Sequence, residues 1–138
     1  MNFHEEELDT FKNSINEYIE PLVKRHNLSS IWEEDGIYSI FSERFSIHFY
    51  CTGAHTYSFN VTVSPDRENS DRARGFYWLV RYVGKDKPIE SNFADLNSFQ
   101  NAIIELSNIL AAYIGLLLNA TPAFWKEFNE YVRKEIKK

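Results

Sequence analysis

Residues 45–64 read FSIHFYCTGAHTYSFNVTVS, and apolar and polar side chains alternate through most of this stretch. Side chains two positions apart lie on the same face of a strand, so the alternation predicts two half-buried strands joined by a turn at 53–55. The predicted core face carries Phe45, Ile47, Phe49 and Cys51 from one strand and Tyr57, Phe59, Val61 and Val63 from the other.

The two-residue period extends in both directions, over residues 31–84. Asp35-Gly36 predicts a tight hairpin, because glycine tolerates the positive φ that such turns need, and a further turn is expected near Glu43-Arg44. Residues 65–75 form a charged loop, which we predict to be the most mobile internal segment. Residues 76–83, FYWLVRYV, then read as the last strand. Together these segments predict a meander of four or five antiparallel strands.

Helical spacing of three and four residues appears on both sides of the strands. One helix runs from about residue 3 into the twenties, and Pro21 is expected to kink it or end its first segment, because proline lacks an amide proton. A long core helix covers 96–117, and Thr121-Pro122 predicts a last helix with Trp125, Phe128, Val132 and Ile136 on its apolar face. The pattern predicts one α+β domain over residues 1–138, with an N-terminal helix, a four- to five-stranded antiparallel meander and two C-terminal helices packed on one face of the sheet.

Charge and composition limit the classes of partner. The net charge is −5, and residues 1–35 hold 9 acidic and 3 basic side chains. Nucleic acid is disfavoured because phosphate binding needs clustered basic residues, whereas a basic protein partner is allowed. The most apolar run, residues 109–118, is too short to span a bilayer and predicts a buried helix, with no membrane partner. The single cysteine and an N-terminus without a signal pattern predict a cytoplasmic protein.

Residues suited to catalysis or metal binding are sparse. His48, Cys51 and His55 are the closest grouping of soft metal ligands, but strand alternation puts Cys51 in the core and His48 on the other face. Glu105 is expected to face solvent, and the sequence contains no nucleophile motif or phosphate-binding glycine loop. We therefore predict a buried Cys51, no metal, no cofactor and no enzymatic activity.

Two surfaces are candidates for binding a partner. The chain has 11 Phe, 8 Tyr and 3 Trp, which is more than a small core needs. The sheet face opposite the core carries His48, Tyr50 and Asn60, joined by Tyr77 and Arg81 if Trp78 lies in the core, or by Phe76, Trp78 and Tyr82 if the last strand has the other phase. The second surface is acidic and could steer a basic protein. It consists of Glu5, Glu6, Glu7 and Asp9 at the helix start and Glu33, Glu34 and Asp35 at the hairpin.

The layout of the chain can be compared with known families. It has an opening helix with a late Pro21-Leu22, an aromatic-rich meander over residues 37–63, and closing helices with Leu116-Leu117-Leu118 and a Lys-rich tail. This layout resembles small bacterial domains of unknown function, including immunity proteins against polymorphic or contact-dependent toxins. The resemblance implies a cytoplasmic, non-enzymatic inhibitor that occludes one toxin domain. The alternative is a small-molecule-binding protein or an enzyme that uses a cleft between sheet and helices.

Overall fold

The computed structural model describes residues 3–51, 57–66, 73–84 and 92–137, so the expected turn at 53–55 and most of the loop at 65–75 lie outside the described residues. The helical segments are α1 (Phe3–Ser14), a π-helical turn (Ile15–Ile19), α2 (Glu20–Arg25), α3 (Phe76–Val83), α4 (Leu96–Leu118) and α5 (Pro122–Ile136). The strands are β1 (Ser29–Glu34), β2 (Ile37–Phe41), β3 (Ser46–Cys51), β4 (Tyr57–Ser64), β5 (Arg74–Gly75) and β6 (Asn92–Phe93).

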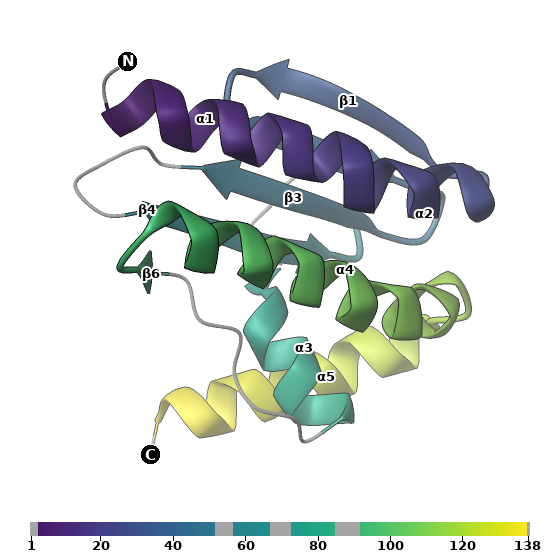
Figure 1. Ribbon diagram of the computed structural model, residues 1–138. Helices are drawn as coiled ribbons and strands as arrows, with labels where there is room; N and C mark the ends of the chain where they lie inside the picture. Colours follow the sequence, from purple (N-terminus) through teal and green to yellow (C-terminus); the bar gives the residue numbers. More distant parts are fainter. Residues whose placement is uncertain (1–2, 52–56, 67–72, 85–91, 138) are drawn as a thin grey trace.

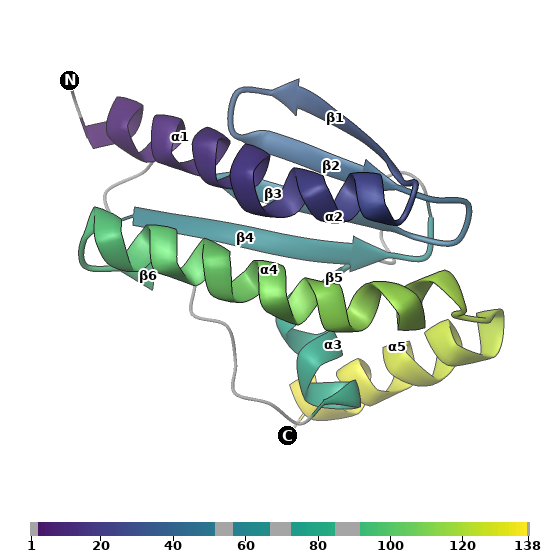
Figure 2. The ribbon, with the colours of Figure 1, turned by 45° about the vertical axis from the view of Figure 1, so that its right-hand side comes forward.

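The strands form an antiparallel meander with the helices on one side. β1 to β5 lie in chain order, each antiparallel to the next, and the short β6 pairs with β4. α1 and α4 lie side by side over one face of the sheet, and α3 and α5 lie below α4, next to the β4–β5 edge (Figures 1 and 2). The predicted α+β fold is confirmed.

The core lies between this sheet face and the long helices. The ring centroids of Phe59 on β4 and Phe99 on α4 lie 5.8 Å apart, and those of Phe11 on α1 and Trp32 on β1 lie 5.9 Å apart. The hydroxyl of the buried Tyr38 donates a hydrogen bond to the Glu20 carboxylate on α2. Burial and this bond raise the pKa of Tyr38. Aromatic contacts thus pack α1 and α4 against the strands, and the Tyr38–Glu20 hydrogen bond joins α2 to β2.

The π-helical turn shows how the N-terminal helix accommodates Pro21. Proline has no amide proton, and its ring crowds the carbonyl of the residue four positions earlier. The wider turn at Ile15–Ile19 comes directly before α2, which has Pro21 in its first positions. The helical residues continue through Pro21 to Arg25, so in place of the predicted kink or end the structure has a local widening of the helix directly before the proline.

The β1–β2 hairpin turns at Gly36, as the Asp35-Gly36 pair predicts, with φ of 85°. A β-carbon at this position would lie 2.9 Å from the Cys51 carbonyl oxygen. Gly36→Ala is therefore expected to cost more than about 1 kcal/mol of unfolding free energy in urea titrations, since the backbone conformation and the clash both penalise a side chain. Gly115→Ala on α4 is the control, because a β-carbon there meets nothing within 4 Å. Equal effects of the two changes would contradict this account.

The strand prediction for residues 76–83 is wrong, because these residues form helix α3. Phe76, Leu79 and Val80 are buried at helical spacing, and the Phe76 ring lies 6.1 Å from that of Tyr113 on α4. Tyr82 also packs against three rings of α5, those of Phe124, Phe128 and Tyr131. Packing against α4 and α5 thus overrides the strand preference of aromatic and β-branched residues.

The last two helices begin at polar caps. The Asp95 carboxylate accepts the Ser98 amide at 2.7 Å, and the Thr121 hydroxyl accepts the Phe124 amide at 3.1 Å, the latter as predicted. Ile136, predicted on the apolar face of α5, is instead 63% exposed, since it lies in the last turn, beyond the buried Val132.

Helix α4 is long and apolar enough to cross a membrane, and it is the one such helix in the part of the chain that the structure describes. A core helix passes the same test of length and composition. One side of α4 is buried in the protein core, through residues that include Phe99, Ile103, Leu106 and Leu110. The prediction that the apolar run is too short to span a bilayer counted residues 109–118 alone, and the 23-residue helix that contains them corrects it. The buried side of α4 agrees with the predicted place of this helix in the core.

Candidate functional site

The sheet face opposite α1 and α4, which we name the open face, carries no helix among the residues that the structure describes (Figures 1 and 2). Ile31 is 52% exposed and Asn60 is exposed, whereas Ile37, Phe41 and Tyr50 are half-buried. The accessible side chains of the open face are thus apolar or polar, with the carboxylates of Glu33 and Glu34 at its β1 margin. Its three rows are Ser29, Phe41, Ser46 and Ser64; Ile31, Ser39, His48 and Thr62; and Glu34, Ile37, Tyr50 and Asn60. Ser39, Ser46, His48 and Ser64 of these rows are buried.

A chain of buried hydrogen bonds runs across the open face at the level of the strands. The Ser39 hydroxyl donates to Glu33 Oε2 at 2.7 Å and lies 2.7 Å from Nδ1 of His48. The other ring nitrogen of His48, Nε2, lies 3.1 Å from the Ser46 hydroxyl, which donates to the Asp66 carbonyl at 2.6 Å. Ser39 and Ser46 are fully buried and His48 is 2% exposed. These bonds join β1, β2 and β3 and hold the open face in one conformation.

The imidazole of His48 is the titratable group of this network. Burial lowers the pKa of His48 below 6.5, and the negative charge of Glu33, whose Oε2 lies 3.9 Å from Nδ1, opposes the shift. The ring is therefore neutral near pH 7 and has only one N–H for two serine partners. Each serine hydroxyl has a single proton, so one of them must donate to the unprotonated ring nitrogen in place of its bond to Glu33 Oε2 or to the Asp66 carbonyl. The network consequently depends on pH.

The unfolding free energy is expected to fall as the pH drops below about 6.5, because the unfolded chain then binds a proton at His48 before the folded chain does. The loss should level off below the folded-state pKa of His48. Urea unfolding between pH 7.5 and 5, run on the protein and on His48→Asn, measures the contribution as a difference in slope. His26→Asn is the control at another histidine. An unchanged pH slope in His48→Asn would contradict the prediction.

The structure places the predicted sheet-face residues in different environments. Tyr50 and Asn60 lie on the open face, as the alternation predicts, and their role in binding stays a prediction. His48 faces the same side but is buried, so a direct contact with a partner is excluded for it. The alternation correctly predicts which face of the sheet His48 lies on. It cannot predict that the rings of Phe41 and Tyr50 lie beside the imidazole, with centroids 6.0 and 6.3 Å from that of His48.

Tyr77 and Arg81 do not lie on the sheet face, because their segment forms α3. The Arg81 guanidinium donates to the Tyr77 hydroxyl at 3.1 Å and lies 5.4 Å from the centre of the Trp78 ring. It also lies 3.5 Å from the Glu135 carboxylate on α5. The arginine is thus a link between α3 and α5.

The acidic residues of α1 divide between surface and core. Glu5 and Glu6 are exposed in the first turn, as expected. Glu7 is fully buried, which corrects its prediction as a surface charge: it lies four residues before Phe11, on the face that packs on the sheet. Its Oε1 accepts the Ser58 amide at 3.0 Å and the Cys51 thiol at 3.5 Å.

The acidic residues of the hairpin are exposed, and both views place the hairpin above α1 (Figures 1 and 2). Asp35 pairs with Lys12 in the last turn of α1 at 3.1 Å, and the Glu33 side chain, 45% exposed, lies beside the open face. We name the exposed acidic residues of the hairpin and of the first turn of α1 the acidic patch: Glu5, Glu6, Glu33, Glu34 and Asp35.

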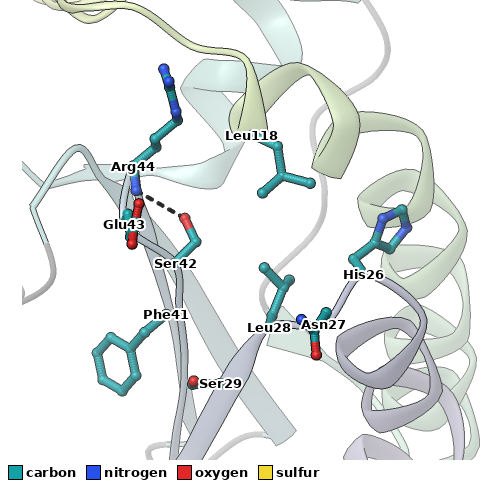
Figure 3. A pocket seen from close by; sticks show the side chains of 9 residues that line it. All are labelled: His26, Asn27, Leu28, Ser29, Phe41, Ser42, Glu43, Arg44 and Leu118. Atoms are coloured by element: carbon teal, nitrogen blue, oxygen red, sulfur yellow. Dashed lines mark hydrogen bonds between the residues drawn. The ribbon is translucent and has the colours of Figure 1, made fainter.

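A pocket of about 660 Å³ opens at the end of the sheet opposite the β1–β2 hairpin (Figure 3). Leu28 and Leu118 point toward one another across it, while the Arg44 side chain points away from them. The Arg44 guanidinium donates to the Ala120 carbonyl at 3.3 Å. The sequence does not predict this pocket, because its lining comes from three distant segments. The lining residues are His26, Asn27, Leu28, Ser29, Phe41, Ser42, Glu43, Arg44 and Leu118.

The grouping of His48, Cys51 and His55 is only partly described, since His55 lies outside the described residues. Both ring nitrogens of His48 contact serines, and Cys51 lies on the other face, half-buried against the core instead of fully buried as predicted. Cys51 is the last residue of β3, where the sheet ends, which explains its partial exposure. In the described ranges no three His, Cys, Asp or Glu side chains are placed to share a metal ion.

Comparisons of this chain with models of protein families, with curated proteins and with solved structures find no match.

Proposed function

We propose that this chain is a non-enzymatic protein-binding domain that occludes a partner through the open face of its sheet. The observation that carries the proposal is the composition and support of that face. Ile31, Tyr50 and Asn60 combine apolar, aromatic and amide groups, the mixture found at the centres of protein interfaces. The buried hydrogen bonds of Ser39, His48 and Ser46 fix the strands beneath them. Binding then needs little ordering of the face, which favours affinity.

The charges around the open face favour a basic partner. The hairpin part of the acidic patch lies at one end of the sheet, and Glu33 extends it to the margin of the open face. Exposed charges mainly accelerate encounter, whereas the central aromatic and apolar contacts hold the complex. The specific form of the proposal is a cytoplasmic immunity protein that neutralises a basic toxin domain, in line with the resemblance of the layout to such proteins.

Co-expression with the C-terminal domain of the neighbouring gene's product, taken as the candidate toxin, tests this function. We expect the chain to restore growth and to co-purify with that domain in equal amounts. Tyr50→Ala should lose rescue, while Tyr77→Ala, a tyrosine on α3, should keep it. The proposal fails if the wild-type chain neither rescues growth nor co-purifies, or if the isolated chain turns over a small substrate.

The pocket between Leu28 and Leu118 favours a second candidate, a small-molecule-binding protein. Its volume of about 660 Å³ lies in the range of ligand sites, and its lining combines apolar side chains with the polar His26, Asn27 and Ser42. Native mass spectrometry of gently purified protein should then show a bound molecule of fixed mass, and Leu118→Trp should remove it by filling the pocket. Identical spectra for both proteins would exclude this candidate.

A further inference from the structure

β1 is an edge strand of the sheet, and its side that faces away from β2 is exposed. All its side chains except the half-buried Trp32 are exposed. Within the described part of the chain, the backbone of residues 29–34 makes no hydrogen bond outside the β1–β2 ladder. An edge of this kind offers unpaired amide and carbonyl groups to another strand. The irregularity between Trp32 and Glu34 limits the regular part of the edge to the stretch from Ser29 to Trp32.

The edge carries opposite charges at its two ends. α2 ends beside the start of β1, and its last turn contributes the exposed Lys24 and Arg25 (Figure 1). The other end carries the exposed Glu33 and Glu34. An identical edge laid antiparallel on this one brings the acidic end of each copy against the basic end of the other. A parallel arrangement would instead place like charges together. The charges therefore select the antiparallel orientation.

An exposed apolar side chain marks the middle of the same strand. Ile31 and Ile136 are the exposed large apolar side chains among the residues described, and Ile31 lies at the centre of β1 on the open face. A two-fold axis near Ile31 would place the two copies of this residue opposite one another as a cross-strand pair. Each copy would cover the isoleucine of the other.

We propose that β1 is a self-association edge, through which two copies of this chain pair antiparallel about a two-fold axis near Ile31. The result is one continuous sheet with an open face twice as wide. Tyr50 and Asn60 lie on β3 and β4, away from the new contact, whereas Ile31 belongs both to this contact and to the proposed binding face. Self-association is measured on the isolated chain, so its outcome does not depend on whether the open face binds a partner. A single pair of short strands is a small interface, so the dimer is reversible and forms as the protein concentration rises.

Sedimentation equilibrium of the purified chain over a wide range of concentrations tests the proposal. We expect a monomer–dimer equilibrium in the wild-type protein. Ile31→Lys should leave a monomer at all concentrations, because it places two like charges opposite each other on the axis. Circular dichroism checks that the variant is folded. A wild-type protein that stays monomeric, or an Ile31→Lys protein that dimerises as well as wild type, would overturn the proposal.

Charge reversal tests the orientation. Arg25→Glu and Glu34→Lys should each weaken the dimer by about threefold to tenfold, since the two-fold axis repeats every contact. The double variant restores opposite charges and should recover most of the loss. Lys134→Glu, on the exposed side of α5, is the matched control and should have no effect. A double variant weaker than either single one would contradict the antiparallel pairing.

Discussion

Phe99→Ala is expected to destabilise the protein by about 3–5 kcal/mol, the largest effect foreseen for a single side chain. Phe99 is fully buried on α4, and its ring lies 5.8 Å from that of Phe59 and 6.2 Å from that of Phe93. Alanine would leave a cavity where β4, β6 and α4 meet. The loss is measured by urea unfolding.

Asn101→Ala is the control for this prediction, because Asn101 is exposed on the same helix. It should change the unfolding free energy by no more than about 0.5 kcal/mol. If Phe99→Ala lowered the unfolding free energy no more than Asn101→Ala does, α4 would not pack on the sheet as described. The layered fold, and with it the definition of the open face, would then need revision.

Tyr50→Ala is expected to cost about 2 kcal/mol or more of binding free energy, roughly a 30-fold loss of affinity, toward a partner that docks on the open face. Tyr50 lies in the row of Ile37 and Asn60, beside the buried His48 ring. Isothermal titration with the purified partner measures the change. Tyr50 is half-buried beside the His48 ring, so urea unfolding of Tyr50→Ala is measured as well, and the affinities are compared under conditions in which both proteins are folded.

Two further variants test whether the partner binds at the open face and not elsewhere on the protein. Tyr77→Ala removes the same kind of side chain from α3 and should leave the affinity unchanged. Joint replacement of Glu5 and Glu6 by Gln should mainly slow association and reduce its dependence on salt, because exposed charges steer the encounter. A larger loss of affinity from Tyr77→Ala than from Tyr50→Ala would move the interface from the sheet to α3.

The parts of the fold that follow a local period are predictable from the sequence. Apolar and polar residues alternate through most of Phe45 to Cys51 and Tyr57 to Ser64, so their strands and faces follow from geometry. The 23-residue helix α4 has a strong apolar stripe, and Thr121-Pro122 predicts the start of α5. These elements depend little on their neighbours, which is why the α+β layout can be inferred without the structure.

The sequence predictions fail where contacts between distant segments determine the secondary structure or the burial of a residue. The segment Phe76–Val83 has apolar residues at both strand and helix spacing, and contacts with Tyr113 and the rings of α5 select the helix. Glu7 has the sequence context of a surface charge, but it is buried in the structure, where its carboxylate accepts hydrogen bonds from the Ser58 amide and the Cys51 thiol. The candidate site is therefore only half predictable: alternation gives Tyr50 and Asn60, whereas the burial of His48 and the exposure of Ile31 follow from the assembled sheet.

The central claim, that the open face binds a protein, is tested most directly by site-specific photo-crosslinking in the native cells. A photoreactive amino acid replaces Asn60, exposed on the open face, or Asn108, exposed on α4 on the opposite side of the molecule. The account predicts one crosslinked partner of defined mass from position 60 and none from position 108, with loss of the position-60 product in a Tyr50→Ala background. A crosslink from position 108 alone, or none from position 60, would contradict it.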